Sequence, residues 1–169
     1  LFSAVSIVIF FTALELVLKL AGVRSVLYEE DPYVGFVSSS SVYVEDPEAV
    51  GQTYLVTAPN KLKHFNPQRF LKTKPDGAYR IFTLGGSTTY GRPYDDMHSF
   101  SGWLRELLPS VDRSRHFEVI NAGAISYASY RVARLMEELI EYDPDLFIIY
   151  SGHNEFLERR TYGALIEQP

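Results

Sequence analysis

Residues 79–91 read YRIFTLGGSTTYG, an apolar run that passes directly into glycines and hydroxyl side chains. The first six of these residues, 79–84, are predicted to form a buried β-strand. Two further runs, HFEVIN at 116–121 and DLFIIY at 145–150, follow at intervals that leave room for a helix between strands. Because the last run is almost entirely apolar, we expect it to be a central strand covered on both faces.

The two intervals between these strands carry apolar residues at helical spacing, which predicts an amphipathic helix in each. The first stripe consists of Phe100, Trp103, Leu104, Leu107 and Leu108. The second consists of Ala128, Val132, Leu135, Met136, Leu139 and Ile140. Pro109 is expected to end the first helix. Strands that alternate with helices predict an α/β fold with a parallel sheet and right-handed crossovers.

Residues 1–23 form a first zone, LFSAVSIVIFFTALELVLKLAGV, in which the first 14 residues carry no charge. Glu15 and Lys19 are four residues apart and can pair on one helical face. The length is about that of a membrane-spanning helix, so we expect a membrane anchor or signal-anchor helix here. A helix that packs against a partner or in a core is the alternative.

Residues 24–77 form a second zone that is rich in Pro, Asp, Asn and Ser and is therefore predicted to lack long helices. Two alternating stretches, SVYVE at 41–45 and TYLVT at 53–57, are expected to pair as a hairpin. We interpret this zone as a linker and irregular extended cap. The α/β domain is expected to occupy 78–169 and to be incomplete at its C-terminus. Because the chain begins with Leu1 and its pattern runs to Pro169, we expect a fragment that is open at both ends.

The composition of the 169 residues is that of a globular protein, with 46% hydrophobic and 22% charged residues. The formal net charge of −5 gives no sign of nucleic-acid binding, which favours a basic surface. The absence of Cys from the sequence excludes disulfides, thiolate metal sites and a Cys nucleophile. No His or carboxylate pair has convincing metal-ligand spacing, and no cofactor is expected.

Small polar residues and glycines follow each predicted strand, at 85–91, 122–127 and 151–155. Ligands of open parallel sheets bind outside the carboxyl ends of the strands. A hydroxyl after the first strand, backbone N–H groups after the second and a carboxamide after the third could therefore converge. Together they would supply a nucleophile with two donors for an oxyanion.

The sequence resembles the SGNH hydrolases, also called GDSL esterases and lipases, in three motifs that occur in the family's order. They are GGSTTYG at 85–91, NAGAISYAS at 121–129 and GHNE at 152–155. The resemblance covers about residues 78–160, the first half to two-thirds of such a domain. It implies a three-layer α/β/α sheet of the flavodoxin-like type and a serine acyl-enzyme mechanism.

The resemblance also implies roles for single residues. Ser87 matches the nucleophile, and Asn154 matches the asparagine whose side-chain amide donates to the oxyanion. Ser126 stands where the family has a Gly whose backbone N–H donates, and Gly123 is a turn residue or the donor in another register. Gly86 stands where the family name implies Asp. The alternatives are that Ser87 and Asn154 simply cap the helical segments that they begin.

The triad's acid and base lie in a DxxH motif near the C-terminus of family members, and we expect them beyond Pro169. The string Asp95-Asp96-Met97-His98 follows Ser87 too closely and is expected to be a solvated loop. His153 is expected to shape the pocket and is a lesser candidate for the base. The carboxylates from Glu137 to Asp145 are expected to be solvated.

These observations predict a membrane-anchored serine ester hydrolase or acyltransferase that acts on a glycan or lipid ester in the periplasm or outside the cell. The 169 residues alone are expected to be essentially inactive. A non-catalytic carbohydrate-binding or assembly module of the same fold is the alternative. A nucleotide-phosphate binder is a third option, although the loop at 85–91 lacks both GK[ST] and GxGxxG.

Overall fold

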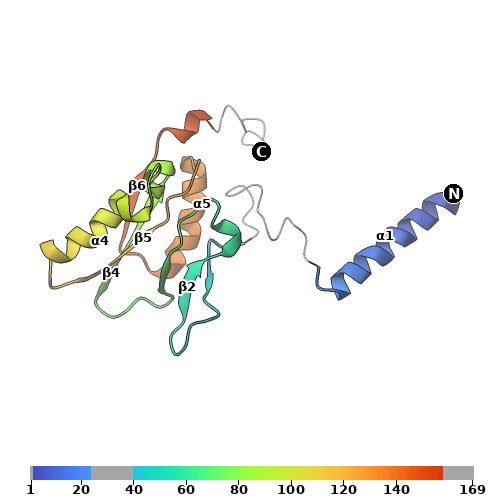
Figure 1. Cartoon of the computed structure of the whole chain (residues 1–169), viewed down its shortest axis with the longest axis horizontal. Helices are drawn as coiled ribbons and strands as arrows, with labels where there is room; N and C mark the ends of the chain where they lie inside the picture. Colours follow the sequence, from blue (N-terminus) through green and yellow to red (C-terminus); the bar gives the residue numbers. More distant parts are fainter. Residues whose placement is uncertain (1, 24–39, 158–169) are drawn as a thin grey trace.

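The computed structural model describes residues 2–23 and 40–157. It contains an antiparallel and a parallel three-stranded sheet, and α-helices connect the strands of the parallel sheet (Figure 1). The helices are α1 (Phe2–Leu20), α3 (Ser87–Tyr90), α4 (Phe100–Val111) and α5 (Ser129–Leu139), with short 3-10 helices η1 (Pro59–Lys61), η2 (Asp96–His98) and η3 (Ile140–Tyr142). The strands are β1 (Tyr43–Glu45), β2 (Tyr54–Thr57), β3 (Arg69–Leu71), β4 (Ala78–Gly85), β5 (His116–Asn121) and β6 (Leu146–Tyr150). The α/β fold predicted from the sequence is confirmed at this level.

The parallel sheet has the order β5-β4-β6. Its register sets Thr83 of β4 between Asn121 of β5 and Ile148 of β6. All three predicted strands are present, with bounds within one residue of those expected. The carboxyl ends of β4, β5 and β6 therefore lie at one edge of the sheet, where the three glycine-containing segments begin.

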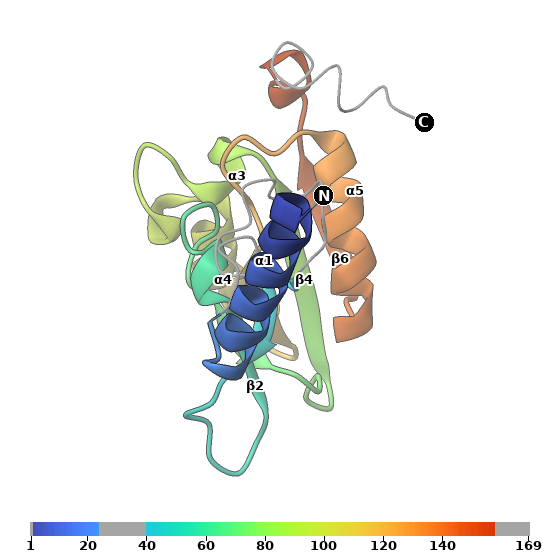
Figure 2. The same cartoon turned by 90° about the vertical axis from the view of Figure 1, so that its right-hand side faces the viewer.

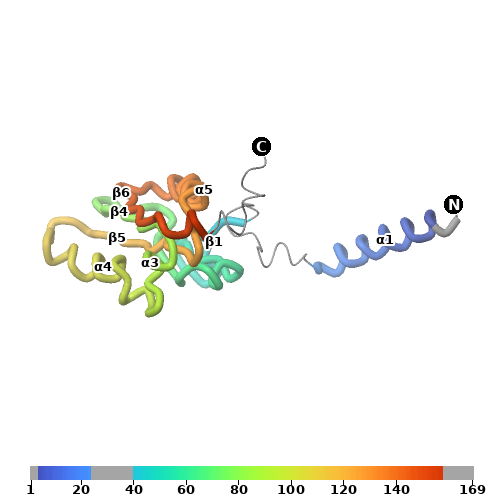
Figure 3. Tube along the Cα trace, turned by 90° about the horizontal axis from the view of Figure 1, so that it is seen from above, coloured from blue at the N-terminus to red at the C-terminus, as the bar shows by residue number. Residues whose placement is uncertain are grey.

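Helices cover both faces of this sheet, with α4 on one side and α5 on the other (Figure 3). Side chains of β4 alternate between the two faces because successive residues of a strand point in opposite directions. Thr83 faces α4, where its hydroxyl lies 2.6 Å from the Ser101 hydroxyl. Phe82 and Leu84 face the other way and pack in the main apolar core, together with residues of α5.

The helix α4 differs from the prediction at its end, because it continues through Pro109 to Val111. A proline removes one backbone hydrogen bond and crowds the preceding turn. Only two residues of the helix follow Pro109, so the helix loses little by including it. The predicted apolar stripe is also only partly covered, since Trp103 is 59% exposed and Leu107 53% exposed.

Among the described residues, β6 lies at an edge of the parallel sheet, whereas its apolar sequence predicts a central strand. In the described part of the chain, β4 is the central strand and β6 pairs only with β4. Leu146, Ile149 and Tyr150 are accordingly exposed, whereas Phe147 packs against the core. An apolar run thus predicted the strand correctly, but it did not determine the position of the strand in the sheet.

The second sheet confirms the predicted hairpin and adds a third strand. β1 and β2 pair antiparallel with Val44 opposite Val56, and β3 pairs with the other edge of β2. The part of the linker prediction that covers residues 24–39 lies outside the described residues. The two sheets share one apolar cluster, formed by Val42, Tyr43, Leu55, Phe65, Phe70, Phe82, Leu84, Ile120, Ala122, Ala124, Tyr127, Val132, Leu135 and Leu139.

Arg80 joins the two sheets from the middle of this core, where its side chain has no exposed surface. Its guanidinium pairs with the carboxylate of Glu118 on β5, with an Nε–Oε2 distance of 2.9 Å. The same group donates to the carbonyl oxygen of Leu71 on β3 at 2.8 Å and to that of Tyr142 in η3 at 2.7 Å. A buried cation is tolerated only when it is paired and hydrogen-bonded in this way.

Two of the carboxylates that were expected to be solvated are engaged in the fold. Glu138 on α5 accepts hydrogen bonds from the backbone N–H groups of Val42 and Tyr43, at 2.9–3.1 Å. Asp145 accepts from the backbone N–H of Arg80 at 2.6 Å and from the Lys74 ammonium at 3.1 Å. Both carboxylates bind groups that are distant in sequence, which a pattern of charges along the chain does not indicate.

The N-terminal helix α1 forms as predicted, and Glu15 and Lys19 pair at 2.9 Å. The side chains of residues 4–23 are all exposed. Within the residues that the structure describes, no helix is both long enough and apolar enough to cross a membrane. The predicted membrane-spanning helix is therefore not supported. Figure 2 looks along the molecule from the side on which α1 lies.

Replacing Glu138 with Ala is expected to destabilise the protein, because the amides of Val42 and Tyr43 lose their acceptor in a part-buried position. We expect a loss of about 1–3 kcal/mol in the free energy of unfolding, measured by urea denaturation. Glu137→Ala is the matched control, since among the described residues Glu137 pairs with Arg134 alone and both side chains are more than half exposed. That change should stay within about 0.5 kcal/mol. Equal losses in the two variants would contradict the assigned role of Glu138.

Candidate active site

A pocket of about 290 Å³ lies at the carboxyl ends of β4 and β6. Its wall consists of Gly86, Ser87, Thr88, Tyr150, Ser151, Gly152, His153 and Asn154. The first and third of the three sequence motifs thus meet in one cavity, as parallel neighbouring strands require. The wall combines hydroxyl, imidazole and carboxamide groups and includes no carboxylate and no Lys or Arg side chain.

Ser87 is the first residue of the single helical turn α3, and Gly86 before it is the N-cap. No side-chain capping bond is made at this end of the turn. The Ser87 hydroxyl has no hydrogen-bond partner among the described residues, although its backbone carbonyl accepts from the N–H groups of Gly91 and Arg92. The capping role that was the alternative for Ser87 therefore does not describe its side chain, which borders the pocket instead.

Asn154 is buried, and its side-chain amide reaches across to the second motif. The Nδ2 group donates to the carbonyl oxygen of Tyr127 at 2.7 Å. A carboxamide nitrogen carries two hydrogens, so this bond leaves one of them unused, and Asn154 itself borders the pocket. The bond to Tyr127 also orients the amide, which a side chain that merely caps the following helix would not require.

Gly86 supplies the room that Asn154 needs. Its φ of −86° is open to any residue, so backbone conformation does not require glycine here. A Cβ at this position would instead collide with the Asn154 Nδ2 atom and lie 3.4 Å from the Tyr127 oxygen. Any side chain at position 86, including an Asp, would therefore have to displace the Asn154 amide.

The second motif contributes less directly to the pocket. Ser126 has a φ of 64°, a left-handed conformation that favours glycine, which is the residue the family resemblance implies at this position. Its N–H makes no hydrogen bond with the described residues, and Ser126 is not part of the pocket wall. The N–H of Gly123, the other candidate donor, already donates to Asn121 Oδ1 at 2.9 Å.

Two histidines were considered as bases, and they lie in different places. His153 borders the pocket. His98 lies outside the pocket wall, with its Nδ1 atom 2.7 Å from Asp95 Oδ1. Both side chains of this pair are about two-thirds exposed, and the hydrogen bond from His98 holds the pKa of Asp95 below its usual range. The structure thus gives Asp95 and His98 the solvated positions expected of this loop.

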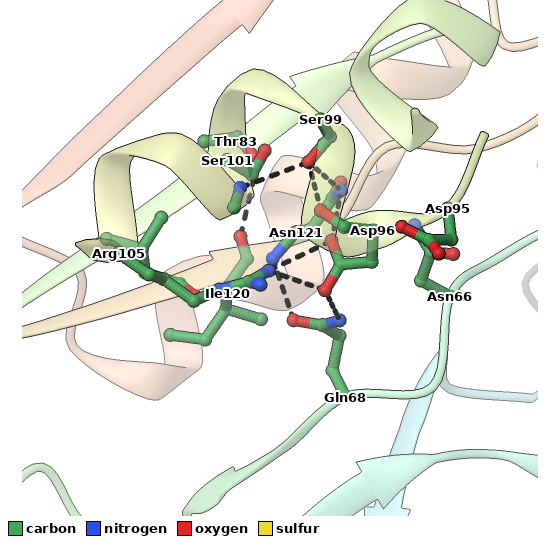
Figure 4. A network of polar contacts seen from close by, with 12 residues as sticks. Asn66, Gln68, Thr83, Asp95, Asp96, Ser99, Ser101, Arg105, Ile120 and Asn121 are labelled. Atoms are coloured by element: carbon green, nitrogen blue, oxygen red, sulfur yellow. Dashed lines mark hydrogen bonds and ion pairs between the residues drawn. The ribbon is translucent and has the colours of Figure 1, made fainter. Parts of the chain in front are cut away.

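Asp96 departs from the solvated loop that was predicted for residues 95–98. Its side chain is only 20% exposed and pairs with Arg105 at 2.7 Å. It belongs to a polar network beneath α3 that also includes Gln68, Ser99 and Asn121 (Figure 4). Sequence reasoning missed this network, and the only available signal was an Asn at the end of a strand whose other residues are mostly apolar.

Glu155 ties the third motif to the start of α5. Its Oε1 atom accepts hydrogen bonds from the Ser129 backbone N–H at 2.9 Å and from the Ser151 hydroxyl at 3.0 Å. Burial acts to raise the pKa of Glu155, but these and other hydrogen bonds outweigh it and hold the pKa below its usual range. Glu155 therefore stays ionised and fixes the segment that carries Asn154.

Among the described residues, no group of three or more His, Asp and Glu side chains could hold a metal ion. Comparison with protein-family models, with curated proteins and with solved structures finds no match to this chain. The geometry of the pocket is therefore the basis for any functional interpretation.

Replacing Gly86 with Ala is expected to displace the Asn154 side chain and break its hydrogen bond to Tyr127, because the added methyl group occupies the space of Nδ2. The Asn154 side-chain amide resonances in an ¹⁵N-¹H spectrum report this change. Thr88→Ala is the control, since it alters the pocket wall without adding an atom near Asn154. Amide resonances that are unchanged by Gly86→Ala would contradict the steric role of Gly86.

Proposed function

We propose that this protein is a serine ester hydrolase or acyltransferase in which Ser87 forms the acyl-enzyme. The observation that carries the proposal is the meeting of two groups in one pocket. They are the Ser87 hydroxyl, which has no hydrogen-bond partner among the described residues, and the oriented amide of Asn154. A nucleophile with an adjacent preorganised donor is the arrangement that acyl transfer requires.

The sheet supports a finer proposal for the fold. Helices on both faces of a parallel sheet agree with the three-layer α/β/α arrangement of the flavodoxin-like type, and we propose that the described strands are its first part. The motif at 85–91 begins at the last residue of β4, and the motif at 121–129 begins at the last residue of β5. The motif at 152–155 follows the end of β6. This agreement supports the resemblance to the SGNH hydrolases.

The proposed chemistry proceeds through two transfers. The Ser87 Oγ atom attacks the ester carbonyl carbon and passes its proton to a base, and the carbonyl oxygen becomes negative. The Asn154 amide donates to that oxygen, together with the backbone N–H of Ser87. The family resemblance implies the N–H of Ser126 as a further donor, although Ser126 lies outside the described pocket wall. The alcohol then leaves with a proton, and water or an acceptor hydroxyl takes the acyl group from Ser87.

The base is proposed to be a His in the chain beyond Pro169, as the family resemblance implies, and His153 is the candidate within the pocket wall. The substrate is proposed to be a glycan or lipid ester outside the cytoplasm. The exposed apolar surface of α1 is suited to lipid or to an apolar partner, which agrees with a substrate at a membrane surface.

A non-catalytic carbohydrate-binding or assembly module is the second candidate. The observation that favours it is that no described residue hydrogen-bonds the Ser87 hydroxyl, so no described base activates it. Hydrolytic activity that depends on Ser87 distinguishes the enzyme from this module.

Replacing Ser87 with Ala is expected to abolish p-nitrophenyl acetate hydrolysis by the full-length protein, because the acyl group then has no nucleophile. The 169-residue chain, which lacks the proposed base, should show at most about 10³–10⁴-fold acceleration over water. Ser110→Ala is the control, since Ser110 is exposed on α4 and, within the part of the chain that the structure describes, its hydroxyl bonds the Leu107 carbonyl oxygen alone. A full-length Ser87→Ala protein with normal turnover would refute the proposed nucleophile.

Replacing Asn154 with Ala in the full-length protein is expected to lower kcat about 10²–10³-fold with little change in KM. The amide meets the oxygen mainly in the transition state, so ground-state binding is hardly affected. Loss of the hydrogen bond to Tyr127 should also remove about 1 kcal/mol of stability, which the melting temperature reports. A destabilised variant with nearly normal kcat would leave Asn154 a structural role only.

A further inference from the structure

We propose that Asp96 is a positioning residue for the candidate nucleophile: its carboxylate orients the Asn121 amide, which holds in place the helical turn that carries Ser87. For its effect on catalysis this inference rests on the proposed function. Its structural part concerns contacts beneath α3 that can be tested without any substrate.

The turn α3 requires external support because it has only four residues. A single turn fixes several backbone dihedrals for very few hydrogen bonds and is unfavourable by itself. Two carbonyl groups at its end find partners in other segments. Thr89 O accepts from the Asn121 amide at 2.9 Å, and Tyr90 O accepts from the Asn66 amide at 2.7 Å.

The Asn121 side chain is fully buried, and both hydrogens of its amide nitrogen have acceptors within reach. Its Nδ2 group donates to Thr89 O and, at 2.6 Å, to Asp96 Oδ1. Its Oδ1 atom accepts from the Gly123 N–H. Reversing the amide would set its oxygen against the Thr89 carbonyl and the Asp96 carboxylate. The negative charge of Asp96 therefore selects the orientation that supports α3.

Asp96 is itself held firmly from two directions. The Arg105 guanidinium of α4 pairs with it at 2.7 Å and also donates to the Val119 carbonyl oxygen of β5 at 2.8 Å. The Gln68 amide, from the segment between β2 and β3, donates to Asp96 Oδ2 at 3.1 Å. The carboxylate thus connects the segment between β2 and β3, the helix α4 and, through Asn121, the end of β5 (Figure 4).

The backbone of Gly123 completes the support of α3. A Cβ at this position would lie 2.5 Å from the Tyr90 nitrogen and 2.8 Å from the Thr89 Cβ atom. The second motif therefore packs directly against the turn, and the hydrogen bond from Gly123 to Asn121 keeps it there. Loosening Asn121 would release both the turn and this packing surface.

The test replaces Asp96 with Asn, which keeps the shape of the side chain and removes its charge. In the 169-residue chain, hydrogen exchange is measured at the backbone amides of Tyr90, Gly91, Arg92 and Gly123. The Tyr90 amide donates to the Gly86 carbonyl oxygen, and those of Gly91 and Arg92 donate to the Ser87 carbonyl oxygen. The Gly123 amide donates to Asn121 Oδ1. We expect exchange at these amides to become about tenfold faster, because local opening of the turn is easier without its support.

Thr83→Val is the matched control. Thr83 is fully buried in the same region, and its hydroxyl bonds the Ser101 hydroxyl without touching α3. Its loss should lower global stability without selectively exposing the turn. Equal exchange at the α3 amides in the two variants would overturn the proposal, whatever the enzymatic activity of the protein.

Kinetics of the full-length protein supply the second readout. Asp96→Asn is expected to lower kcat about 10–10²-fold with KM within about twofold, since a misplaced nucleophile slows the reaction more than it weakens binding. Thr83→Val should leave both constants near their original values. An equal decrease of kcat in both variants would contradict the positioning role and would leave Asp96 with a structural role only. Absence of any Ser87-dependent turnover would instead refute the proposed function and leave the exchange result to decide the positioning.

Gln68→Ala provides a milder variant in case Asp96→Asn does not fold. It removes one donor to Asp96 and the acceptor of the Asn121 backbone N–H, at 3.0 Å, while leaving the charge pair intact. The same α3 amides should exchange faster by a smaller factor. Unchanged exchange at α3 in Gln68→Ala, alongside an unfolded Asp96→Asn, would overturn the proposal.

Discussion

The buried guanidinium of Arg80 is the interaction on which the arrangement of the two sheets depends. It satisfies a carboxylate on β5 and carbonyl groups on β3 and in η3, while its own strand is the centre of the parallel sheet. A guanidinium has donors in a fixed planar fork, so it can connect several elements only in one relative placement. Residues 66–68 lie just before β3, so the contacts of Asn66 with α3 and of Gln68 with Asp96 depend on this docking.

Much of the fold could be predicted from the sequence, because the signals involved are local. Three apolar runs predicted the parallel strands, and alternation at 41–45 and 53–57 predicted the antiparallel hairpin. The environment of each element was harder to predict. The β6 strand has one neighbour in the described residues, and Trp103 on α4 is exposed, because side-chain coverage depends on contacts between distant segments. Pro109 shows a similar limit, since its effect depends on how near it lies to the helix end.

The candidate site was predicted in part for the same reason. Ser87 and Asn154 follow strand ends, and parallel pairing of β4 with β6 is sufficient to bring them together. The support beneath them was not predictable, since Asn66, Asp96 and Asn121 come from three separate segments. In sequence, isolated polar residues of this kind are indistinguishable from a solvated surface. Their burial becomes evident only once the antiparallel sheet is placed against the parallel one.

The shared apolar cluster has a consequence for where an independently folding unit can begin. Val42, Leu55 and Phe70 of the antiparallel sheet pack with Phe82 and Leu84 of β4, so neither sheet has a complete interior by itself. A chain starting at Ala78 would present that apolar face to water and leave a carboxylate as the main partner of the Arg80 guanidinium. The antiparallel sheet therefore forms part of the same hydrophobic core as the parallel sheet, and the smallest independently folding unit includes it.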